Sequence, residues 1–182
     1  MEGASNIVLV GPMGAGKSVA GALLARRLGL PFVDLDAAVE ADAGARIAEL
    51  FRRDGEAAFR AREGTALARC LDRDGQVVAT GGGAVLDAGN RRRLRERGLV
   101  AWLQADPETQ LRRLDGCGDR PLLEGADRQA RLRALAGERD PLYREVADLA
   151  VDTRDLDAAG TAEALAVRIA GRWHAPVPGA TS

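Results

Sequence analysis

Short apolar runs alternate along the chain with longer stretches in which apolar residues recur every three or four positions. The short runs are rich in valine and leucine and predict buried strands, whereas the longer repeats have the spacing of an amphipathic helix. This alternation is typical of a parallel sheet whose two faces are covered by helices joined through right-handed crossovers. The pattern predicts an α/β fold, a three-layer sandwich with five parallel strands at residues 7–10, 30–36, 76–80, 99–103 and 149–152.

Turn and cap residues set the expected limits of the helices. Glycine follows the helical pattern at Gly29 and Gly98, as expected just beyond a helix C-terminus. Pro141 should bend or split the helix that contains it. Aspartates that can cap a first turn stand at Asp87, Asp106 and Asp127. The expected helices cover residues 19–28, 45–71 with a break at 54–55, 88–97, a segment from 107 to about 115, a segment after 127, and 161–169.

The first predicted strand runs directly into Gly11–Ser18, which matches the phosphate-loop pattern G-x-x-x-x-G-K-[ST] at every fixed position. Its glycines allow main-chain N–H groups to turn toward phosphate oxygens, and the helix that follows adds partial positive charge at its N-terminus. Lys17 is expected to reach the β- and γ-phosphates, and the Ser18 hydroxyl to ligate Mg²⁺. The nucleotide-binding residues expected here are Gly14, Ala15, Gly16, Lys17, Ser18 and Val19.

The lysine content favours this interpretation over a glycine-rich turn with a chance lysine. The chain has 26 lysine and arginine residues, and all but Lys17 are arginine. A chain that uses arginine for nearly every positive charge has its single ammonium group where the motif requires one.

Two more chemically suggestive segments follow predicted strands. Asp34 and Asp36 end the second strand, and Gly81–Gly83 follow the third. Because parallel sheets bind ligands beyond the carboxyl ends of their strands, we expect these segments and the phosphate loop to share one crevice. Asp34 is expected to take a hydroxyl proton or to hold an acceptor hydroxyl near the metal. The alternatives are a helix N-cap, which fits Asp36 better than Asp34, and a plain turn for the three glycines.

Arg60 and Glu63 are three residues apart on a predicted helix, so Glu63 can orient the guanidinium. An arginine held in this way presents a planar fork suited to a substrate carboxylate. The alternative is an exposed ion pair on the helix surface.

Charge and cysteine content exclude several classes of partner. The formal net charge of −1 gives no electrostatic basis for binding nucleic acid or an anionic membrane. Cys70 and Cys117 are far apart without metal-ligand spacing, and His174 is the one histidine, so we expect free thiols and no histidine chemistry. The first residues lack a signal-peptide pattern, and we expect a cytoplasmic protein.

Together these motifs resemble those of shikimate kinases, and the resemblance covers nearly the whole chain. Many ATPases and GTPases share the phosphate loop, but its combination with the D-x-D, F-R-x-x-E, G-G-G and R-P-L-L motifs in this order is highly specific. The matching segments are Gly11–Ser18, Phe32–Asp36, Gly55–Glu63, Thr80–Gly83, Asp119–Leu123 and Arg139–Tyr143.

The resemblance implies a P-loop kinase fold and ATP-dependent phosphorylation of the 3-hydroxyl of shikimate, with one Mg²⁺ per site. It implies that Asp34, Arg60, Arg139 and the Gly81, Gly82 and Gly83 turn hold shikimate, with the two arginines on its carboxylate. Arg120, on a mobile lid at about 115–126, would close over the phosphates as a catalytic residue with Lys17 and Asp34. Arg113 would stack near the adenine; the alternative is a solvated arginine at a helix end.

A chain of 182 residues is long enough for one well-buried domain with small inserts, and its Pro/Gly/Ser-rich end is typical of a disordered tail. We expect one domain over residues 1–172, with a substrate-binding helical part at about 35–62 and a disordered tail at 173–182. The expected partners are ATP and shikimate, with no nucleic acid and no membrane, and the expected state is a monomer.

Two departures from common patterns concern the metal and the adenine. Thr80–Gly83 stand after the third strand in place of a Walker-B acid, so Mg²⁺ would depend on Ser18, phosphate oxygens and water, with Asp34 behind them. After the fifth strand, residues 154–159 lack the proline that shikimate kinases often have in the adenine-binding loop.

Three other functions are compatible with a phosphate loop. A related small-molecule kinase, such as a gluconate kinase, would not need the arginine fork of Arg60 and Arg139. A GTPase-type switch usually recognises guanine through N-K-x-D, which a chain with its one lysine at Lys17 cannot contain. A degenerate, non-catalytic member of the family is disfavoured by the intact Lys17, Ser18, Asp34 and Arg120.

Overall fold

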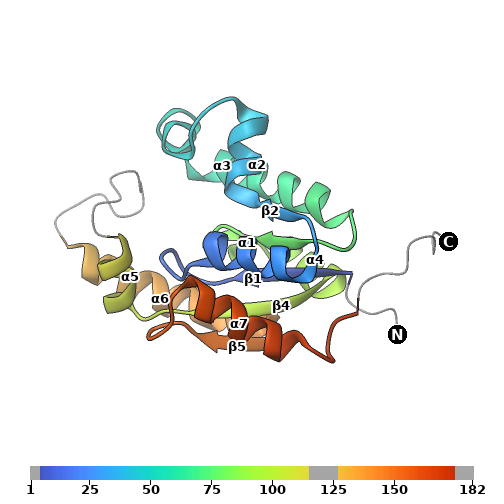
Figure 1. The fold of residues 1–182 in the computed structure, drawn as a ribbon. Coiled ribbons are helices and arrows are strands. Elements are labelled where there is room, and N and C mark those ends of the chain that lie inside the picture. Colours follow the sequence, from blue (N-terminus) through green and yellow to red (C-terminus); the bar gives the residue numbers. More distant parts are fainter. Residues whose placement is uncertain (1–4, 115–126, 175–182) are drawn as a thin grey trace.

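The computed structural model of the chain describes residues 5–114 and 127–174. Within them, five strands form one sheet in the order β2-β3-β1-β4-β5, and every neighbouring pair is parallel (Figure 1). The phosphate-loop strand therefore lies at the centre, beside the strand that precedes the glycine run. The strands are β1 (Asn6–Val10), β2 (Phe32–Asp34), β3 (Val77–Ala79), β4 (Gly98–Gln104) and β5 (Leu149–Asp152).

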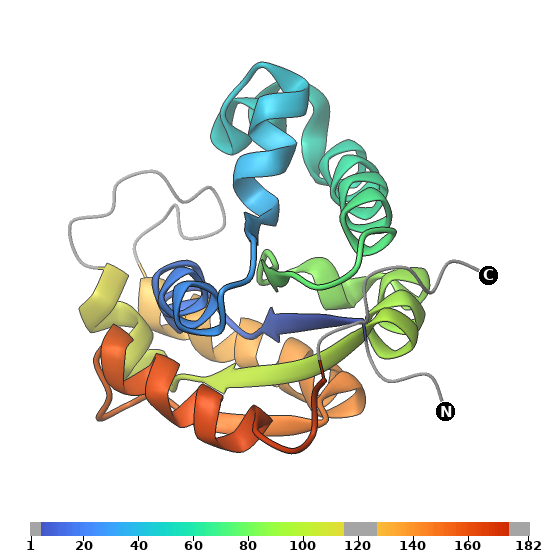
Figure 2. The ribbon, with the colours of Figure 1, turned by 45° about the vertical axis from the view of Figure 1, so that its right-hand side comes forward.

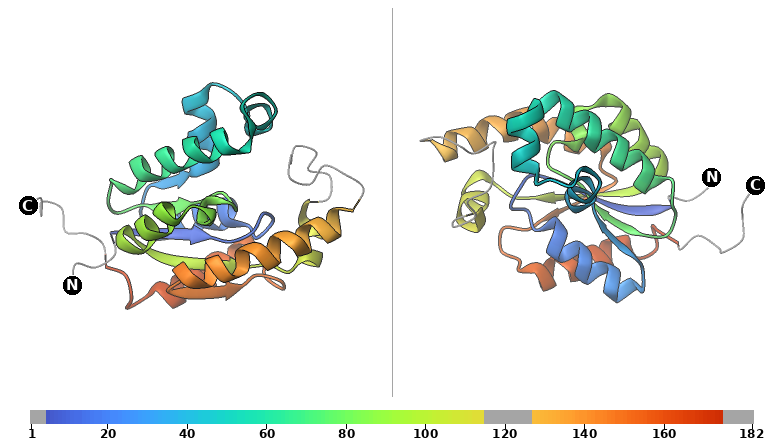
Figure 3. Two further views of the ribbon diagram at one scale, coloured as in Figure 1. Left: turned by 180° about the vertical axis from the view of Figure 1, so that it is seen from behind. Right: turned by 90° about the horizontal axis from the view of Figure 1, so that it is seen from above.

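Helices cover both faces of the sheet, as predicted. Figure 2 shows α1 and α7 on one face, while α3, α4 and α6 contribute to the core on the other. The segment comprising α2 and the first part of α3 rises off the sheet beside β2, above the end of β1 (Figures 2 and 3). The helices are α1 (Lys17–Leu28), α2 (Leu35–Ala43), α3 (Ile47–Leu71), α4 (Ala88–Arg97), α5 (Pro107–Leu114), α6 (Arg128–Val146) and α7 (Ala158–Ile169), with a short 3-10 helix η1 (Ala84–Leu86).

The central strand shows how the sequence specifies these layers. All five residues of β1 are buried. Ile7 and Leu9 pack with α1 and α7, whereas Val8 and Val10 belong to the core on the α3, α4 and α6 side. Side chains alternate between the faces of a strand, so an uninterrupted apolar run is the pattern of a strand buried on both sides.

Most predicted element ends are confirmed. Gly29 has φ of 68° and closes α1, and the Asp87 and Asp127 carboxylates accept N–H groups from the first turns of α4 and α6. The break expected near residues 54–55 is present within α3, where Gly55 has φ of 81° and ψ of 170°. Only glycine adopts this backbone conformation readily, so the chain changes direction there.

Several predicted limits differ from the structure, including the start of α1, which is at Lys17 and not at residue 19. The second strand ends at Asp34 and not at residue 36, and α7 begins three residues before position 161, capped by Asp157. The helix α6 is not split at Pro141, which lies inside it. Its last turns pack against the sheet, because Tyr143 and Val146 belong to the buried core, and this packing stabilises a helix that proline disfavours.

The ends of the described chain add two observations. Trp173 packs against the core on the α1 and α7 side, and residues 175–182 lie outside the described residues. Among the described helices, none combines the length and the apolar character needed to cross a membrane.

Candidate active site

The phosphate loop folds tightly at the carboxyl end of β1. Gly11, Gly14 and Gly16 have φ values of 141°, 76° and 86°, which residues with side chains rarely adopt. A side chain at Gly11 would also collide with the carbonyl oxygen of Leu103 on β4. The motif glycines are therefore required by the backbone geometry of the loop.

Lys17, the first residue of α1, folds back along this loop. Its side chain is 8% exposed, and Nζ donates to the carbonyl oxygens of Gly11 at 2.7 Å and Pro12 at 2.8 Å. A buried ammonium needs such partners. The single ammonium group is thus held against the concave loop, where phosphate oxygens would bind.

Asp34 links this loop to the second strand. The Ser18 hydroxyl donates to Asp34 Oδ2 at 2.5 Å, and Asp34 Oδ1 accepts the Ala37 N–H at 3.2 Å. Asp34 is therefore the N-cap of α2, and the expectation that this role fits Asp36 better is wrong. Because β2 ends two residues earlier than predicted, Asp36 falls in the first turn of α2.

The donor chemistry near Ser18 suits a magnesium ion that is held mainly by a nucleotide. In the part of the chain that the structure describes, no group of three or more His, Cys, Asp or Glu side chains could hold a metal. Ser18 and Asp34 nevertheless bring two oxygen donors together, and Mg²⁺ commonly binds through one or two protein groups, phosphates and water. Thr80, at the Walker-B position, donates its hydroxyl to the Leu9 carbonyl at 3.1 Å.

Arg60 is fixed from several sides. Nη1 donates to Glu63 Oε2 at 2.7 Å and Nη2 to Glu56 Oε1 at 3.2 Å, while Cζ lies 5.2 Å and 5.9 Å from the ring centroids of Phe59 and Phe51. The side chains of Arg60 and Glu63 are 18% and 1% exposed, so the pair is not a surface ion pair. The expectation that Glu63 orients Arg60 is confirmed.

The surroundings of Glu63 contain polar atoms that lack partners. Burial raises the pKa of the Glu63 carboxyl above its ordinary value, against the attraction of Arg60 and of Arg139, and nearby Asp36 raises that pKa further. Among the described residues, buried atoms without a hydrogen bond include Glu63 Oε1, Arg60 Nε and Arg139 Nε. Buried polar groups are normally paired, so this cluster is suited to a small polar ligand.

The glycine run lies between these charged groups and the phosphate loop. A methyl group at Gly83 would overlap the Arg60 guanidinium, and one at Gly81 would lie 2.5 Å from Glu63 Oε1. On the other side, a methyl group at Gly82 would lie 3.5 Å from both the Gly11 oxygen and the Met13 nitrogen. The absence of side chains in this run therefore lets Arg60 and Glu63 approach the turn on one side and the phosphate loop approach it on the other, which a plain turn would not require.

The long helix α6 brings two more residues to the glycine run. Arg139 is 5% exposed, and Tyr143, one turn later, donates its hydroxyl to the Gly82 carbonyl at 2.5 Å. Arg139 and Tyr143 line one small cavity together with Pro12 and Met13 of the phosphate loop. The second arginine of the expected fork therefore lies beside the phosphate loop, and its sharing a ligand with Arg60 stays a prediction.

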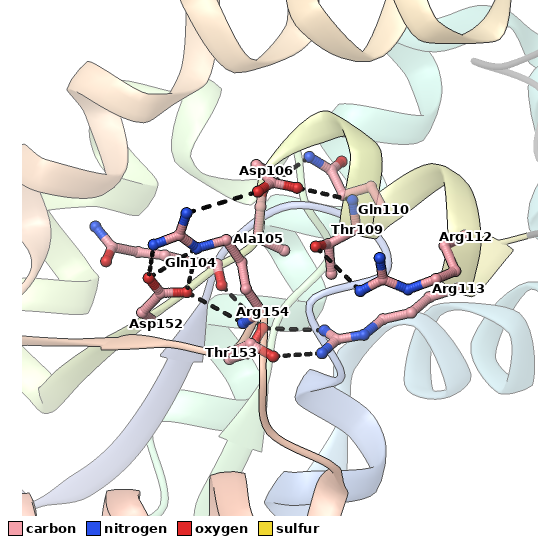
Figure 4. Close-up of polar contacts among 10 residues, drawn as sticks. All are labelled: Gln104, Ala105, Asp106, Thr109, Gln110, Arg112, Arg113, Asp152, Thr153 and Arg154. Carbon is pink, nitrogen blue, oxygen red and sulfur yellow. Dashed lines mark hydrogen bonds and ion pairs between the residues drawn. The ribbon is translucent and has the colours of Figure 1, made fainter.

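Arg113 connects the phosphate loop to the segment after β5 (Figure 4). Nη1 donates to the Gly14 carbonyl at 3.1 Å and to Thr153 Oγ1 at 3.0 Å. Nη2 donates to the main-chain oxygens of Thr153 and, at 3.0 Å, of Leu156. The alternative of a solvated helix-end arginine is therefore wrong, while stacking of Arg113 on adenine stays a prediction.

A surface ion-pair cluster borders the same segment. Arg154 donates to Asp152 at 2.6 Å and approaches Asp106 Oδ2 at 3.9 Å, while Asp106 caps α5 by accepting the Thr109 N–H at 2.7 Å (Figure 4). These side chains are about half exposed and contribute little energy individually. They restrain the loop that lacks the expected proline.

The expected residues fall into three groups. Brought together at the carboxyl ends of β1, β2 and β3 are Gly14, Ala15, Gly16, Lys17, Ser18, Asp34, Arg60, Gly81, Gly82 and Gly83, and Arg139 lies beside the phosphate loop from α6. Val19, in the first turn of α1, is 60% exposed, and a contact with nucleotide stays a prediction. Arg120 and the expected lid at 115–126 lie outside the described residues. The sequence patterns assign no role to Tyr143, which is the last residue of the matching segment Arg139–Tyr143.

Comparisons with known proteins agree with this geometry. The family model described as "Shikimate kinase" matches residues 13–170. This chain belongs to the shikimate kinase family. A shikimate kinase from Stenotrophomonas maltophilia (strain K279a) is 49% identical over 174 residues, covering 96% of this chain and 97% of that protein. One from Xanthomonas campestris pv. campestris (strain 8004) is 47% identical with the same coverage.

A solved member of the shikimate kinase family has the same fold. The structure of shikimate kinase from Acinetobacter baumannii in complex with shikimate aligns with a TM-score of 0.89 at 43% identity. The alignment covers 91% of this chain and 93% of the other. The three-layer α/β sandwich predicted from the hydrophobic pattern and the P-loop kinase fold implied by the resemblance are both confirmed.

Proposed function

We propose that this protein transfers the γ-phosphoryl group of ATP to the 3-hydroxyl of shikimate, forming shikimate 3-phosphate for aromatic amino acid biosynthesis. The observation that carries the proposal is the position of the glycine run, with the phosphate loop on one side and Arg60 on the other. A donor triphosphate and a small anionic acceptor would thereby meet at one point. Membership of the shikimate kinase family supports this function.

The donor end depends on charge and on main-chain amides. The loop N–H groups and the N-terminus of α1 would bind the phosphates, and Lys17 would exchange its carbonyl partners for phosphate oxygens. Ser18, with Asp34 behind it, would hold Mg²⁺, which when bound to ATP neutralises charge on the β- and γ-phosphate oxygens. Arg120 on the 115–126 lid would supply a further cation and exclude water.

The acceptor end depends on arginine and aspartate. Arg60, held by Glu63, and Arg139 would bind the shikimate carboxylate, because a guanidinium fork matches the geometry of a carboxylate. With one end of the acceptor fixed, Asp34 would orient the reacting hydroxyl and take up its proton. Arg113 would position the adenine side of the nucleotide through its bonds to Thr153 and Leu156.

We further propose a monomer that acts in the cytoplasm without nucleic acid or membrane.

A coupled assay of ADP release tests the central proposal. ADP release from ATP should require shikimate, and gluconate should not replace it. Equal rates with gluconate, or release independent of any acceptor, would contradict the proposed substrate.

Replacing Arg60 by alanine should raise the KM for shikimate about 30- to 100-fold and the KM for ATP less than twofold. The lost side chain is a buried, fixed charge, whose removal leaves a substrate carboxylate unpaired. Steady-state kinetics with each substrate varied in turn measures both constants. The control is Arg92→Ala on α4, which removes an arginine that is 68% exposed. Equal effects on both substrates would contradict a carboxylate-binding role.

Replacing Gly83 by alanine should raise the KM for shikimate about tenfold without unfolding the protein. The new methyl group would overlap the Arg60 guanidinium, and a flexible side chain of this kind shifts rather than breaking the fold. The matched control is Gly137→Ala on α6, where a methyl group meets no atom within 4 Å. An unchanged KM for shikimate in the Gly83 variant would show that the position of Arg60 does not matter.

A further inference from the structure

The hydroxyl of Tyr143 forms a polar contact between segments that are far apart in the sequence. It donates to the Gly82 carbonyl oxygen at 2.5 Å, across 61 positions. The side chain is 1% exposed, and its ring packs against Trp102 with centroids 5.9 Å apart. Burial raises the pKa of the hydroxyl, which therefore stays protonated and able to donate at neutral pH.

The carbonyl that accepts this hydrogen bond belongs to the turn that separates the two halves of the site. A methyl group at Gly82 would lie 3.6 Å from the Tyr143 oxygen and 3.5 Å from the Gly11 oxygen and the Met13 nitrogen. Gly82 is thus enclosed by α6 on one side and the phosphate loop on the other.

Fixing one carbonyl also fixes the next amide. The peptide group is planar, and the described chain contains no cis peptide bond, so the N–H of Gly83 points away from the Gly82 carbonyl. Tyr143 therefore sets the direction of the Gly83 N–H, and Gly83 itself lies against the Arg60 guanidinium. Four positions earlier on α6, Arg139 lies on the same face of the helix and lines the same small cavity as Tyr143.

We propose that Tyr143 is a positioning residue for the phosphate acceptor, acting through Gly82. This inference rests on the proposed function. The hydroxyl orients the 81–83 turn and holds α6, with Arg139, in place against it. The hydrogen bond from Tyr143 to Gly82 therefore connects two parts of the proposed shikimate site, the glycine turn and the helix that carries Arg139.

Tyr143→Phe tests the proposal, because it removes the hydroxyl and retains the ring. The KM for shikimate should rise about tenfold, since a partly buried carbonyl loses its partner and the turn loses its orientation. The kcat should fall less than threefold, and the KM for ATP should change less than twofold. Equal increases in both KM values, or an unchanged KM for shikimate, would overturn the proposal.

A matched control separates positioning from general stability. Gln76 is 4% exposed and donates its side-chain amide to the Cys70 carbonyl at 2.5 Å, at the opposite end of β3 from the glycine turn. Gln76→Met removes a comparable buried hydrogen bond to a main-chain oxygen. It should lower the thermal unfolding temperature like Tyr143→Phe and leave the KM for shikimate unchanged. A rise in KM equal to that of Tyr143→Phe would overturn the proposal.

A second measurement does not depend on the folding of a variant. Tyr143 is the only tyrosine in the chain, so growth with 3-fluorotyrosine places a single ¹⁹F label at this position. Addition of shikimate without nucleotide should shift that resonance in a saturable manner, and an unchanged resonance at saturating shikimate would overturn the proposal. Unlabelled wild-type protein is first assayed for shikimate-dependent ADP release. If it has none, the proposed function is refuted. If it is active, the ¹⁹F result tests the role of Tyr143 alone.

Discussion

Replacing Lys17 by alanine will reduce kcat for shikimate phosphorylation by about a thousandfold or more. The ammonium group is buried at the phosphate loop, where it is bonded to the Gly11 and Pro12 carbonyls. Charge that develops on a transferring phosphoryl group is stabilised most by fixed cations in a site that excludes water, and single donors of this kind contribute about 10²–10³ or more in rate. No other lysine in the chain can substitute for it.

The measurement is the rate of ADP formation at saturating ATP and shikimate, with the circular dichroism spectrum compared between variants. Lys17→Arg is the informative companion, because it keeps the charge but replaces a compact ammonium by a larger planar group. Arg92→Ala, which removes an exposed charge far from the loop in sequence, should retain full activity. Near-normal turnover in Lys17→Ala would eliminate the phosphate-loop assignment.

Replacing Asp34 by asparagine will lower kcat about 10²- to 10³-fold with little loss of stability. Asparagine caps a helix as well as aspartate does, so the bond from the Ala37 N–H to Oδ1 can persist. What is lost is the negative charge beside Ser18 and the ability to take up a proton, and general-base contributions are typically about 10²–10⁴. The loss should therefore appear mainly in kcat and not in KM.

Asp157 offers a matched control for this substitution. It is the N-cap of α7, accepting the Gly160 N–H at 2.7 Å, so Asp157→Asn makes the same chemical change at the same kind of position. Both variants should unfold at nearly the wild-type temperature, and only Asp34→Asn should lose activity. A loss of activity explained by unfolding at the assay temperature would remove Asp34 from the reaction.

The parts of this protein that could be predicted from sequence are those encoded by neighbouring residues. Gly29 and Asp87 mark helix ends through local backbone and hydrogen-bond preferences, and the phosphate loop has a fixed spacing. Each of these inferences uses fewer than about ten consecutive positions.

What could not be predicted depends on pairing between distant segments. The register of β2 with β3 places Asp34 opposite Ala79 at the last strand position, and this makes Asp34 rather than Asp36 the helix cap. Arg113 finds main-chain oxygens at Gly14 and Thr153, positions 99 and 40 residues away. No local pattern marks a carbonyl as a future hydrogen-bond acceptor, so such contacts appear only in three dimensions.

The burial of Lys17 has a practical consequence for labelling. Apart from the amino terminus, its Nζ is the single primary amine of the sequence, and carbonyl oxygens already engage it. Reagents that acylate amines, including succinimidyl dyes and isocyanate, will therefore leave the arginine-rich exterior unmodified. The extent of acylation at this one nitrogen, read by mass spectrometry with and without ATP, will report directly on whether the nucleotide is bound.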